Sequence, residues 1–577
     1  MFTKNFRREA LWRLPLPVFL ILFLWGMEAR YPRVGGDFLP FFRQLLEGRW
    51  HFAHYGLAPL RYAVHLCGGL PLYGHPNDLY YSIPQLLVLI MDPWRAMELS
   101  AVVFLSAGYA GWRLFGSDVL RLSGPWNRVL ALVMISSGFY FMHIHGGHIN
   151  FFAYPLLGWL CWLPLSNEPK WLNTTARAAL FGLLAAAILH TGGYYVLIFF
   201  GILFSAGLPL LLLYRDHADV PDIRTIVSRA FFSAAAAAAV SASKLVAVYS
   251  LMRVIPRAVD LSVLRVSPAL FMLRSLWGFP QNRALFAGAP WSPHENSMFT
   301  SPVVLFGVVI AIFWLVFPNG KDFRRRIISL ACFALLFLIF QSLVAGSGIA
   351  ALALHRLPVF SSIRVSVRYL NIFSIILSVI GVCVLTRSAR RWRPGADAGL
   401  AASAIVITLA GFFLAYRALM PQINLHLDYR QFRTELDRME SAGFTRIPVD
   451  RAVAGDTDFL GTTGIVCTED ALFTWMRQPV RKKMTPGPVR DERGGDFNMM
   501  KPACYAYGPA NNCRPGDRIP AADNKNLDGF LTGGPMTWKI SALQRAADAL
   551  TIASLIAAVE YLFIEWFFRR NAARRAY

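Results

Sequence analysis

The sequence is poor in charged residues, which make up only 16% of its 577 positions, while hydrophobic residues make up 55%. Ordinary soluble domains carry charge on about a quarter of their residues. The mean hydropathy is positive, and apolar runs near the roughly 20 residues that cross a bilayer core recur along the chain. The composition therefore excludes an ordinary soluble protein and predicts an all-α polytopic membrane protein.

Acidic residues are scarcer than basic ones: 34 Asp and Glu stand against 57 Lys and Arg, which gives a net charge of +23. The basic residues lie mainly in short connections between apolar runs. Lys and Arg in such connections are retained on the cytoplasmic side. We interpret the excess as a topology signal and expect membrane lipids, not nucleic acid, as partners.

About twelve transmembrane helices are predicted from the apolar runs, at 14–27, 96–114, 129–142, 151–165, 178–190, 194–214, 230–250, 302–317, 327–343, 370–385, 400–416 and 549–568. Placing the basic connections inside predicts a bacterial inner-membrane protein with both termini cytoplasmic. The run 83–91 is too short to span and lies between prolines, so we expect an interfacial helix.

The pattern divides the chain into a membrane domain, 1–416, with a long first outer loop at 31–95, a soluble outer domain at 417–544, and a last helix with a basic tail at 545–577. Cysteines are few, and none has a spacing typical of metal ligands. Cys467, Cys504 and Cys513 fall in the outer domain, where a disulfide is allowed but its pairing is open.

Asp37 lies just outside the first predicted span, in the stretch GGDFLPFF at 35–42. A carboxylate at this position, followed by aromatic residues, indicates chemistry at the membrane surface on a substrate that the lipid delivers. The alternative is structural, because Asp is a favoured N-cap and the residues from 38 to 46 are amphipathic.

Cations gather on the predicted outer side, where they break the charge rule that the inner connections follow. Lys244 lies in the Ala-rich run 230–250, about two turns from its outer end, and Arg364 and Arg368 lie one turn apart before a later span. Guanidinium groups match phosphate oxygens, which favours a phosphate-bearing lipid substrate. Anionic headgroups and a snorkelling lysine are the alternatives.

Three histidines, His143, His145 and His148, lie close together before Asn150. Neutral imidazole is a common metal ligand, but this spacing is no recognised zinc pattern, and Gly146-Gly147 is typical of a tight turn. We favour polar contacts with a hydroxyl-rich substrate. No metal ligands are assigned, although the sequence leaves a divalent metal open as a cofactor.

The order of these motifs resembles the GT-C superfamily of membrane glycosyltransferases, on GGDFLPFF at 35–42, the long first outer loop and GHINF at 147–151. Three later stretches resemble its bacterial YfhO-like branch: SKLVAVY at 243–249, WSPHEN at 291–296 and LPVFSSIRVSVR at 357–368. The resemblance covers about 14–385 in order.

This resemblance implies transfer of a sugar from a polyprenyl-phosphate donor to an outer-face acceptor, with inversion at the anomeric carbon. Asp37 would be the general base, and cations would meet the leaving phosphate. The expected substrate-binding residues are Lys244, Arg364, Arg368, His148, Asn150, His294, Glu295 and Asp78. The alternative for His294 and Glu295 is an ion pair with a neighbouring arginine.

Two other functions fit the sequence less well. A transporter or flippase for a lipid-linked or anionic substrate would also need membrane cations, but transporters usually show internal repeats, and this sequence has none. A non-catalytic scaffold for envelope assembly would explain the outer domain, yet it leaves Asp37 and the arginines without a task.

Overall fold

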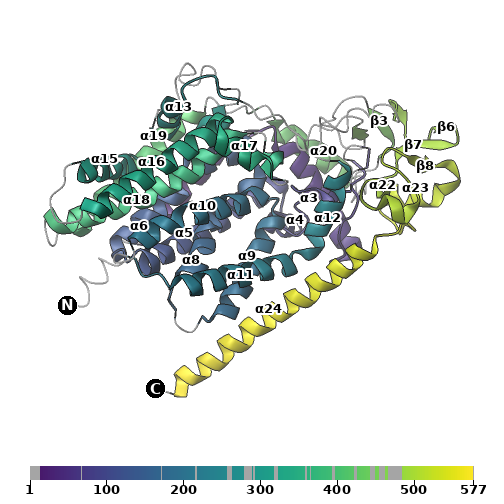
Figure 1. The fold of residues 1–577 in the computed structure, drawn as a ribbon. Helices are drawn as coiled ribbons and strands as arrows, with labels where there is room; N and C mark the ends of the chain where they lie inside the picture. The colour runs from purple at the N-terminus through teal and green to yellow at the C-terminus, as the bar shows by residue number, and fades with distance from the viewer. Residues whose placement is uncertain are drawn as a thin grey trace.

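The computed structural model describes residues 13–65, 68–69, 71–169, 172–214, 218–255, 263–277, 289, 291, 293–316, 323–357, 360–363, 365–392, 397–420, 425, 427–441, 449–453, 462–464 and 484–575. Most of these residues form helices, which build a long bundle with a small mixed domain at one end (Figure 1). The chain is therefore mostly helical, as the composition predicts.

Seven segments of the described chain are long and apolar enough to cross a membrane: Gly124–Gly146, Tyr194–Leu213, Ile223–Val240, Ile327–Ala345, Ser366–Arg390, Asp397–Ala418 and Ala542–Phe568. Four shorter apolar helices are Pro15–Glu28, Ile149–Leu165, Thr174–His190 and Pro302–Leu315. The predicted run 96–114 falls within α5 (Pro93–Leu114), which belongs to neither of these two groups. The number of about twelve spans thus stays a prediction.

The bundle contains α2 (Pro15–Glu28), α5, α6 (Gly124–Ile135), α7 (Gly138–Gly146), α8 (Leu157–Leu165), α9 (Thr174–His190), α10 (Tyr194–Leu213), α11 (Ile223–Val240), α15 (Pro302–Val316), α16 (Phe323–Ala345), α18 (Leu370–Trp392), α19 (Asp397–Leu419) and α24 (Ala542–Arg575). The described chain also has shorter helices: α3 (Phe38–Tyr55), α4 (Ile83–Val88), α12 (Ala242–Val254), α13 (Pro268–Trp277), α14 (Pro293–Asn296), α17 (Ile349–His355) and α20 (Tyr429–Ser441), of which α3, α4, α12 and α20 lie toward the small domain (Figure 1).

Several helices begin where the local sequence supplies a cap. The side chain of Asp92 accepts hydrogen bonds from two backbone N–H groups at the start of α5, and Pro93 occupies the first helical position. Asn173 caps α9 and Asp222 caps α11 in the same way. These side chains satisfy N–H groups that would otherwise lack partners, and so they set where each helix starts.

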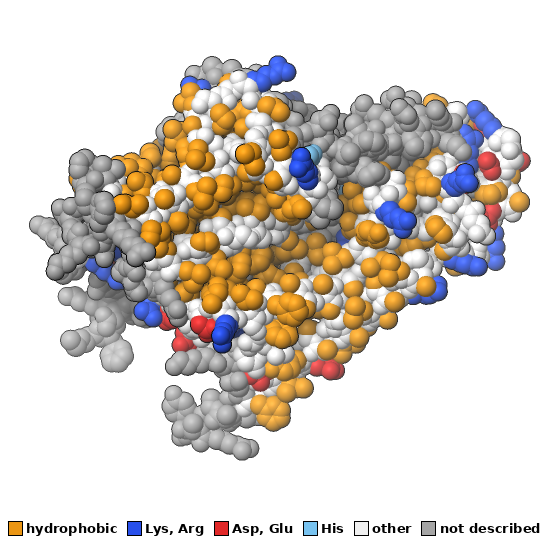
Figure 2. Space-filling model, in the orientation of Figure 1, with side chains coloured by type: hydrophobic (Ala, Val, Ile, Leu, Met, Phe, Trp, Pro, Cys, Tyr) orange, Lys and Arg blue, Asp and Glu red, His pale blue; other side chains and the backbone are white. Residues whose placement is uncertain are grey.

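The segments differ greatly in how much of their surface is buried inside the protein. In Gly124–Gly146, 94% of the most apolar window is buried inside the protein, whereas in Ala542–Phe568 the share is 6%. The first therefore forms the centre of the bundle, and α24 runs along its outside. Figure 2 shows hydrophobic side chains spread over the flank that includes α11 and α24, with basic side chains toward its ends. Such an apolar flank is what a protein presents to lipid.

The predicted span at 230–250 is broken in the structure. Helix α11 ends at Val240 and α12 starts at Ala242, with the non-helical Ser241 between them. Lys244 therefore lies in a separate short helix, which packs against the 3-10 turn Leu72–Gly74 and against α24. Helix α4 is only six residues long, which agrees with the expected short, non-spanning segment at 83–91.

The strands are short and form three small sheets. In the first, β1 (Arg33–Val34) pairs antiparallel with β2 (Leu427–Asp428). The second has the order β4 (Thr462–Gly464), β3 (Arg451–Val453), β5 (Gly487–Pro488), and the third has the order β6 (Glu492–Arg493), β7 (Asp496–Met500), β8 (Arg518–Pro520). The pairing of Arg33 with Asp428 ties the segment before Asp37 to a segment some 400 positions later.

Packing does not follow the predicted boundaries of the 417–544 domain. Helix α20 belongs to the main hydrophobic core, where Tyr429 contacts Phe42 of α3 at a ring separation of 5.4 Å. A second core joins Tyr62 of the first loop and Leu251 of α12 to residues around Phe530 in α23 (Asn524–Thr532). The small domain therefore shares its core with the first loop.

Two of the three cysteines predicted in this region are bonded to each other. Cys504, in α22 (Ala503–Tyr507), forms a disulfide with Cys513. Cys467 lies outside the described residues. The alternative that the sequence left open is thus decided in favour of the two cysteines that flank the turn at Gly508.

Candidate functional site

Two glycine pairs bring Asp37 to the histidine segment. A Cβ atom on Gly35 would lie 2.4 Å from the backbone of Gly146, and one on Gly147 would lie 2.5 Å from the backbone nitrogen of Phe38. Gly147 also has a φ of +98°, a conformation that suits glycine. The turn before α3 and the turn after α7 therefore touch backbone to backbone, which larger residues would prevent.

This contact places Asp37 beside His148. The Asp37 Oδ2 atom lies 2.7 Å from His148 Nε2, and the Asp37 side chain is 58% exposed while His148 is largely covered. Partial desolvation by the surrounding protein raises the pKa of Asp37, but the hydrogen bond and charge of His148 outweigh it and hold the pKa below its ordinary value. Asp37 is thus an ionised carboxylate that is both held in place and open to a partner.

Asp37 occupies the N-cap position of α3, but its side chain makes no capping hydrogen bond. The structural alternative from the sequence was that Asp37 serves only to cap this helix. A capping side chain accepts a hydrogen bond from the backbone N–H groups of the first turn, and Asp37 directs its carboxylate to His148 instead. Its placement is therefore explained by the contact with His148.

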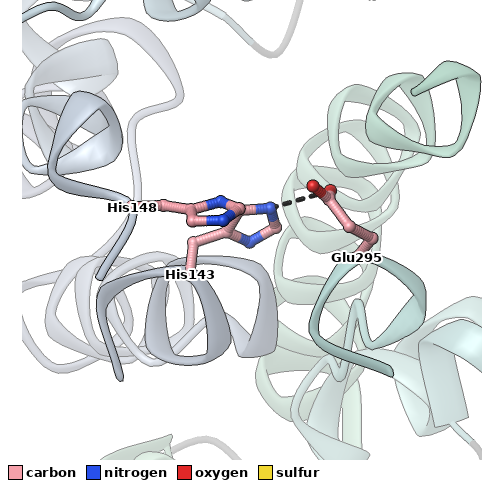
Figure 3. Close-up of side chains that lie close together, drawn as sticks. All are labelled: His143, His148 and Glu295. Carbon is pink, nitrogen blue, oxygen red and sulfur yellow. Dashed lines mark hydrogen bonds and ion pairs between the residues drawn. The ribbon is translucent and has the colours of Figure 1, made fainter. Parts of the chain in front are cut away.

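A second pair lies beside the first, between α7 and α14. His143 Nε2 lies 3.0 Å from Glu295 Oε2, and Figure 3 shows His143 and His148 side by side with Glu295 facing them. His143 Nδ1 lies 2.8 Å from the carbonyl oxygen of Phe139. A carbonyl only accepts, so this nitrogen carries the donated proton.

Glu295 is also the partner of Arg368. The guanidinium donates from Nε to Glu295 Oε2 at 2.8 Å and makes a second, shorter contact with Oε1. It also lies over the rings of Phe151 and Tyr195, at 5.2 and 4.9 Å from their centres. Burial raises the pKa of Glu295, but the charges of Arg368 and His143 hold it well below its usual range. The predicted alternative of an ion pair with an arginine is therefore what Glu295 forms.

His294 completes the group on the side of His148. The two imidazole rings are 4.8 Å apart and nearly perpendicular, and His294 Nε2 lies 3.9 Å from Glu295 Oε1. Burial, with a contribution from His148, lowers the pKa of His294 to about 3. At neutral pH this ring is uncharged, so it can offer a hydrogen bond or a lone pair but no charge for a phosphate.

Lys244 and Asp78 form a separate pair with each other. The Lys244 ammonium donates to Asp78 Oδ2 at 3.2 Å and to the backbone oxygens of Tyr73 and His75 at 2.9 and 2.8 Å. Both side chains are 1% exposed. An ammonium has three donors, and all three are used inside the protein. Both residues are thus paired inside the protein, whereas the sequence placed Lys244 against a phosphate and Asp78 among the substrate-binding residues.

The other predicted site residues are placed as follows. Asn150 is buried in the 3-10 turn Ile149–Phe151, next to His148. Arg364 lies outside the described residues. Arg368 is in the cluster, but its charge is committed to Glu295. Of the predicted set, the structure thus gathers Asp37, His148, His294, Glu295 and Arg368.

His143 is the member of the cluster that was left out of the expected substrate-binding residues. The alternation of His143, His145 and His148 gave no way to choose among them. In a helix, residues two apart face different sides, and His145 points instead toward Phe23, with a ring separation of 5.7 Å. The helix at 138–146 is the signal that distinguishes His143 from His145, because it places them on different faces.

Comparison with known proteins finds solved structures of low similarity and shows no family. No protein-family model matches the chain, and no curated protein matches its sequence. A solved structure of the arabinofuranosyltransferase AftD from mycobacteria has 14% identity and a TM-score of 0.43, over 81% of this chain and 31% of that one. A mutant form of the same protein has 14% identity and a TM-score of 0.39, over 70% and 27%.

The chain therefore spans less than a third of the length of these structures. Identities of 14% and TM-scores below 0.5 carry no conclusion about the function of this chain. They also give no support to the YfhO-like branch, which stays a prediction.

Proposed function

We propose that this protein is an integral membrane glycosyltransferase of the GT-C type, which transfers a sugar from a polyprenyl-phosphate donor to an acceptor on the outer face of a bacterial inner membrane. The observation that carries the proposal is the Asp37 carboxylate. It lies at the end of an apolar bundle, it is 58% exposed, and His148 holds it at 2.7 Å without closing it off.

In the proposed reaction, Asp37 takes the proton from the acceptor hydroxyl as that oxygen attacks the anomeric carbon of the sugar. The new carbon–oxygen bond forms while the bond from carbon to the phosphate oxygen breaks, and the phosphate leaves as an anion. Attack from the face opposite the phosphate inverts the carbon. His148 orients the carboxylate, and Glu295 and Arg368 hold the surrounding elements in place.

The proposed orientation places the Asp37 end of the bundle in the periplasm and both chain ends in the cytoplasm. Arg569, Arg570, Arg574 and Arg575 at the end of α24 support it, because basic residues flanking a span are retained inside. In this arrangement the donor reaches Asp37 from the outer leaflet.

The test is sugar transfer in membranes supplied with a panel of radiolabelled polyprenyl-phosphate sugars. We expect Asp37→Asn to reduce transfer by about 100- to 10,000-fold, the usual contribution of a general base, while donor binding survives. Asp92→Asn is the matched control, because Asp92 is another N-terminal carboxylate of a helix and Asn retains its capping role.

Equal transfer by wild type and Asp37→Asn would refute the role of Asp37. Absence of transfer with every donor by well-folded wild-type protein would refute the glycosyltransferase proposal, and would favour a transporter, a flippase or a scaffold.

A further inference from the structure

The pair formed by His143 and Glu295 presents a problem of charge. His143 Nδ1 is already bound to the Phe139 carbonyl oxygen, so a neutral ring has only a lone pair at Nε2. That lone pair points at Glu295 Oε2, another acceptor, from 3.0 Å. Two acceptors at this distance repel each other unless a proton or a cation lies between them, and the Arg368 guanidinium, which binds the same carboxylate, does not fill that place. Either an extra proton on His143 or a bound cation resolves the conflict.

His148 supplies a third ligand at the same place. His143, His148 and Glu295 each offer one ligand atom, and these atoms all lie within 4.8 Å of one another. His143 lies in α7, His148 lies in the turn that follows it, and Glu295 lies in α14, so segments far apart in the sequence meet here (Figure 3). Zinc binds nitrogen and oxygen at roughly 2.0–2.2 Å, so small adjustments would bring all three atoms to one ion.

The contacts around the three side chains are those that support metal ligands. A metal-binding histidine usually donates its other ring N–H to a carbonyl or a carboxylate, and a metal-binding carboxylate is itself hydrogen-bonded. His143 donates to the Phe139 carbonyl, and Glu295 accepts from Arg368. The outer contacts would fix the rings and the carboxylate before an ion arrives.

We propose that His143, His148 and Glu295 form a binding site for a divalent transition-metal ion of the zinc class. Two imidazoles with one carboxylate suit zinc and its neighbours, whereas magnesium and calcium prefer oxygen ligands alone. Lys244 and Arg368 are already committed to carboxylates, so an ion here would add positive charge beside Asp37. The inference concerns the site of the proposed function but does not depend on sugar transfer.

The test uses the full chain purified in detergent without a histidine tag, stripped with a chelator and then titrated with Zn²⁺, Mn²⁺ or Mg²⁺. Calorimetry and elemental analysis should show one Zn²⁺ per chain, with much weaker binding of Mg²⁺. We expect His143→Gln and His148→Gln each to weaken Zn²⁺ binding at least tenfold. X-ray absorption should show nitrogen and oxygen ligands at about 2.0–2.2 Å.

His145→Gln is the matched control, because His145 lies in the same helix, is buried and has the same Nδ1 contact with a backbone carbonyl. It should bind Zn²⁺ as the wild type does. His148→Gln keeps the test open if the buried His143 variant does not fold, since His148 is the more exposed of the two.

Failure of the wild type to retain one Zn²⁺ would overturn the inference, as would Zn²⁺ binding by the His143 and His148 variants that equals binding by the wild type. The cluster would then be held by a proton on His143. Zinc binding without sugar transfer would leave this inference standing and count against the proposed function.

Discussion

Two pairs of charged or polar side chains, Lys244 with Asp78 and Asp37 with His148, consist of residues that the sequence assigned to the same substrate site, but the structure places them in different surroundings. Lys244 and Asp78 are each 1% exposed and bind each other, and Lys244 also donates to two backbone oxygens. Asp37 is 58% exposed and has one side of its carboxylate held by His148. The difference is whether the protein itself uses all the hydrogen-bonding capacity of a charge. A charge that is fully used supports the fold, whereas one that is partly used can meet a substrate.

The largest expected effect on stability comes from the closed pair. Lys244→Met should lower the free energy of unfolding by about 3–5 kcal/mol, because it leaves Asp78 buried without its counter-charge. Denaturation in detergent measures the change. The double variant with Asp78→Leu should recover most of the loss, since replacing both partners by apolar residues is often neutral.

A Lys244→Met protein of normal stability that has lost sugar transfer would break the comparison. It would return Lys244 to the role that the sequence suggested, contact with the phosphate of the donor.

The next effect concerns the Glu295 carboxylate. Glu295→Gln should lower the free energy of unfolding by about 1.5–3 kcal/mol at neutral pH, because charge-assisted hydrogen bonds with Arg368 are lost. The folded pKa of Glu295 lies well below the ordinary 4.5. Its ionised form therefore stabilises the fold above pH 4.5, and this contribution disappears as the pH falls through the folded pKa.

Thermal unfolding at a series of pH values checks this expectation. Wild-type stability should fall as the medium is acidified below pH 4.5, and the Glu295→Gln variant should lack that part of the decline. Parallel curves for the two proteins would show that Glu295 is not ionised in the fold.

A smaller effect is expected where the two turns touch. Gly147→Ala should destabilise the protein by about 1–2 kcal/mol, the cost of a left-handed conformation for a residue with a Cβ. The added atom would also press on the backbone of Asp37 and Phe38, so we expect transfer to fall further than stability. Gly146→Ala is the control, because no atom outside its own stretch of helix lies within 4 Å of its Cβ position. Similar transfer by both variants would show that the close contact does not position Asp37.

The smallest effect on stability belongs to the open carboxylate. Asp37→Asn should change the free energy of unfolding by less than about 1 kcal/mol, since an exposed pair contributes little and the side chain makes no cap. Asp92→Ala should cost about 1–2 kcal/mol, because its side chain caps α5. Denaturation of both variants decides between them. A larger loss for Asp37→Asn would assign it a structural role.

Sequence patterns predicted the helices of the bundle well because apolar length is a local property. The expected segment at 400–416 lies inside α19, and the one at 370–385 lies inside α18. The break at Ser241 was missed because Ala and Ser around it are compatible with a continuous helix. Only the packing of α12 against the first loop and α24 distinguishes the two arrangements.

The candidate site was predicted in part for the same reason. Asp37 follows a span directly, and such a carboxylate can be found by position alone. The partners of Glu295 could not be found by position, because His143 and Arg368 lie 152 and 73 positions away in the sequence. Basic residues near a predicted interface were all candidates for phosphate, and the sequence gave no means to tell which ones would be neutralised inside the protein.

The sequence by itself determined that this is a helical membrane protein and that Asp37 follows its first apolar helix, because hydrophobic length and order along the chain need no knowledge of contacts. Tertiary structure alone decided which charged side chains are paired inside the protein and which remain open to a substrate. Lys244 meets Asp78 across 166 positions, and Asp37 meets His148 through two touching glycine turns. Such pairs depend on distances of a few ångströms between elements, which only the packed fold sets.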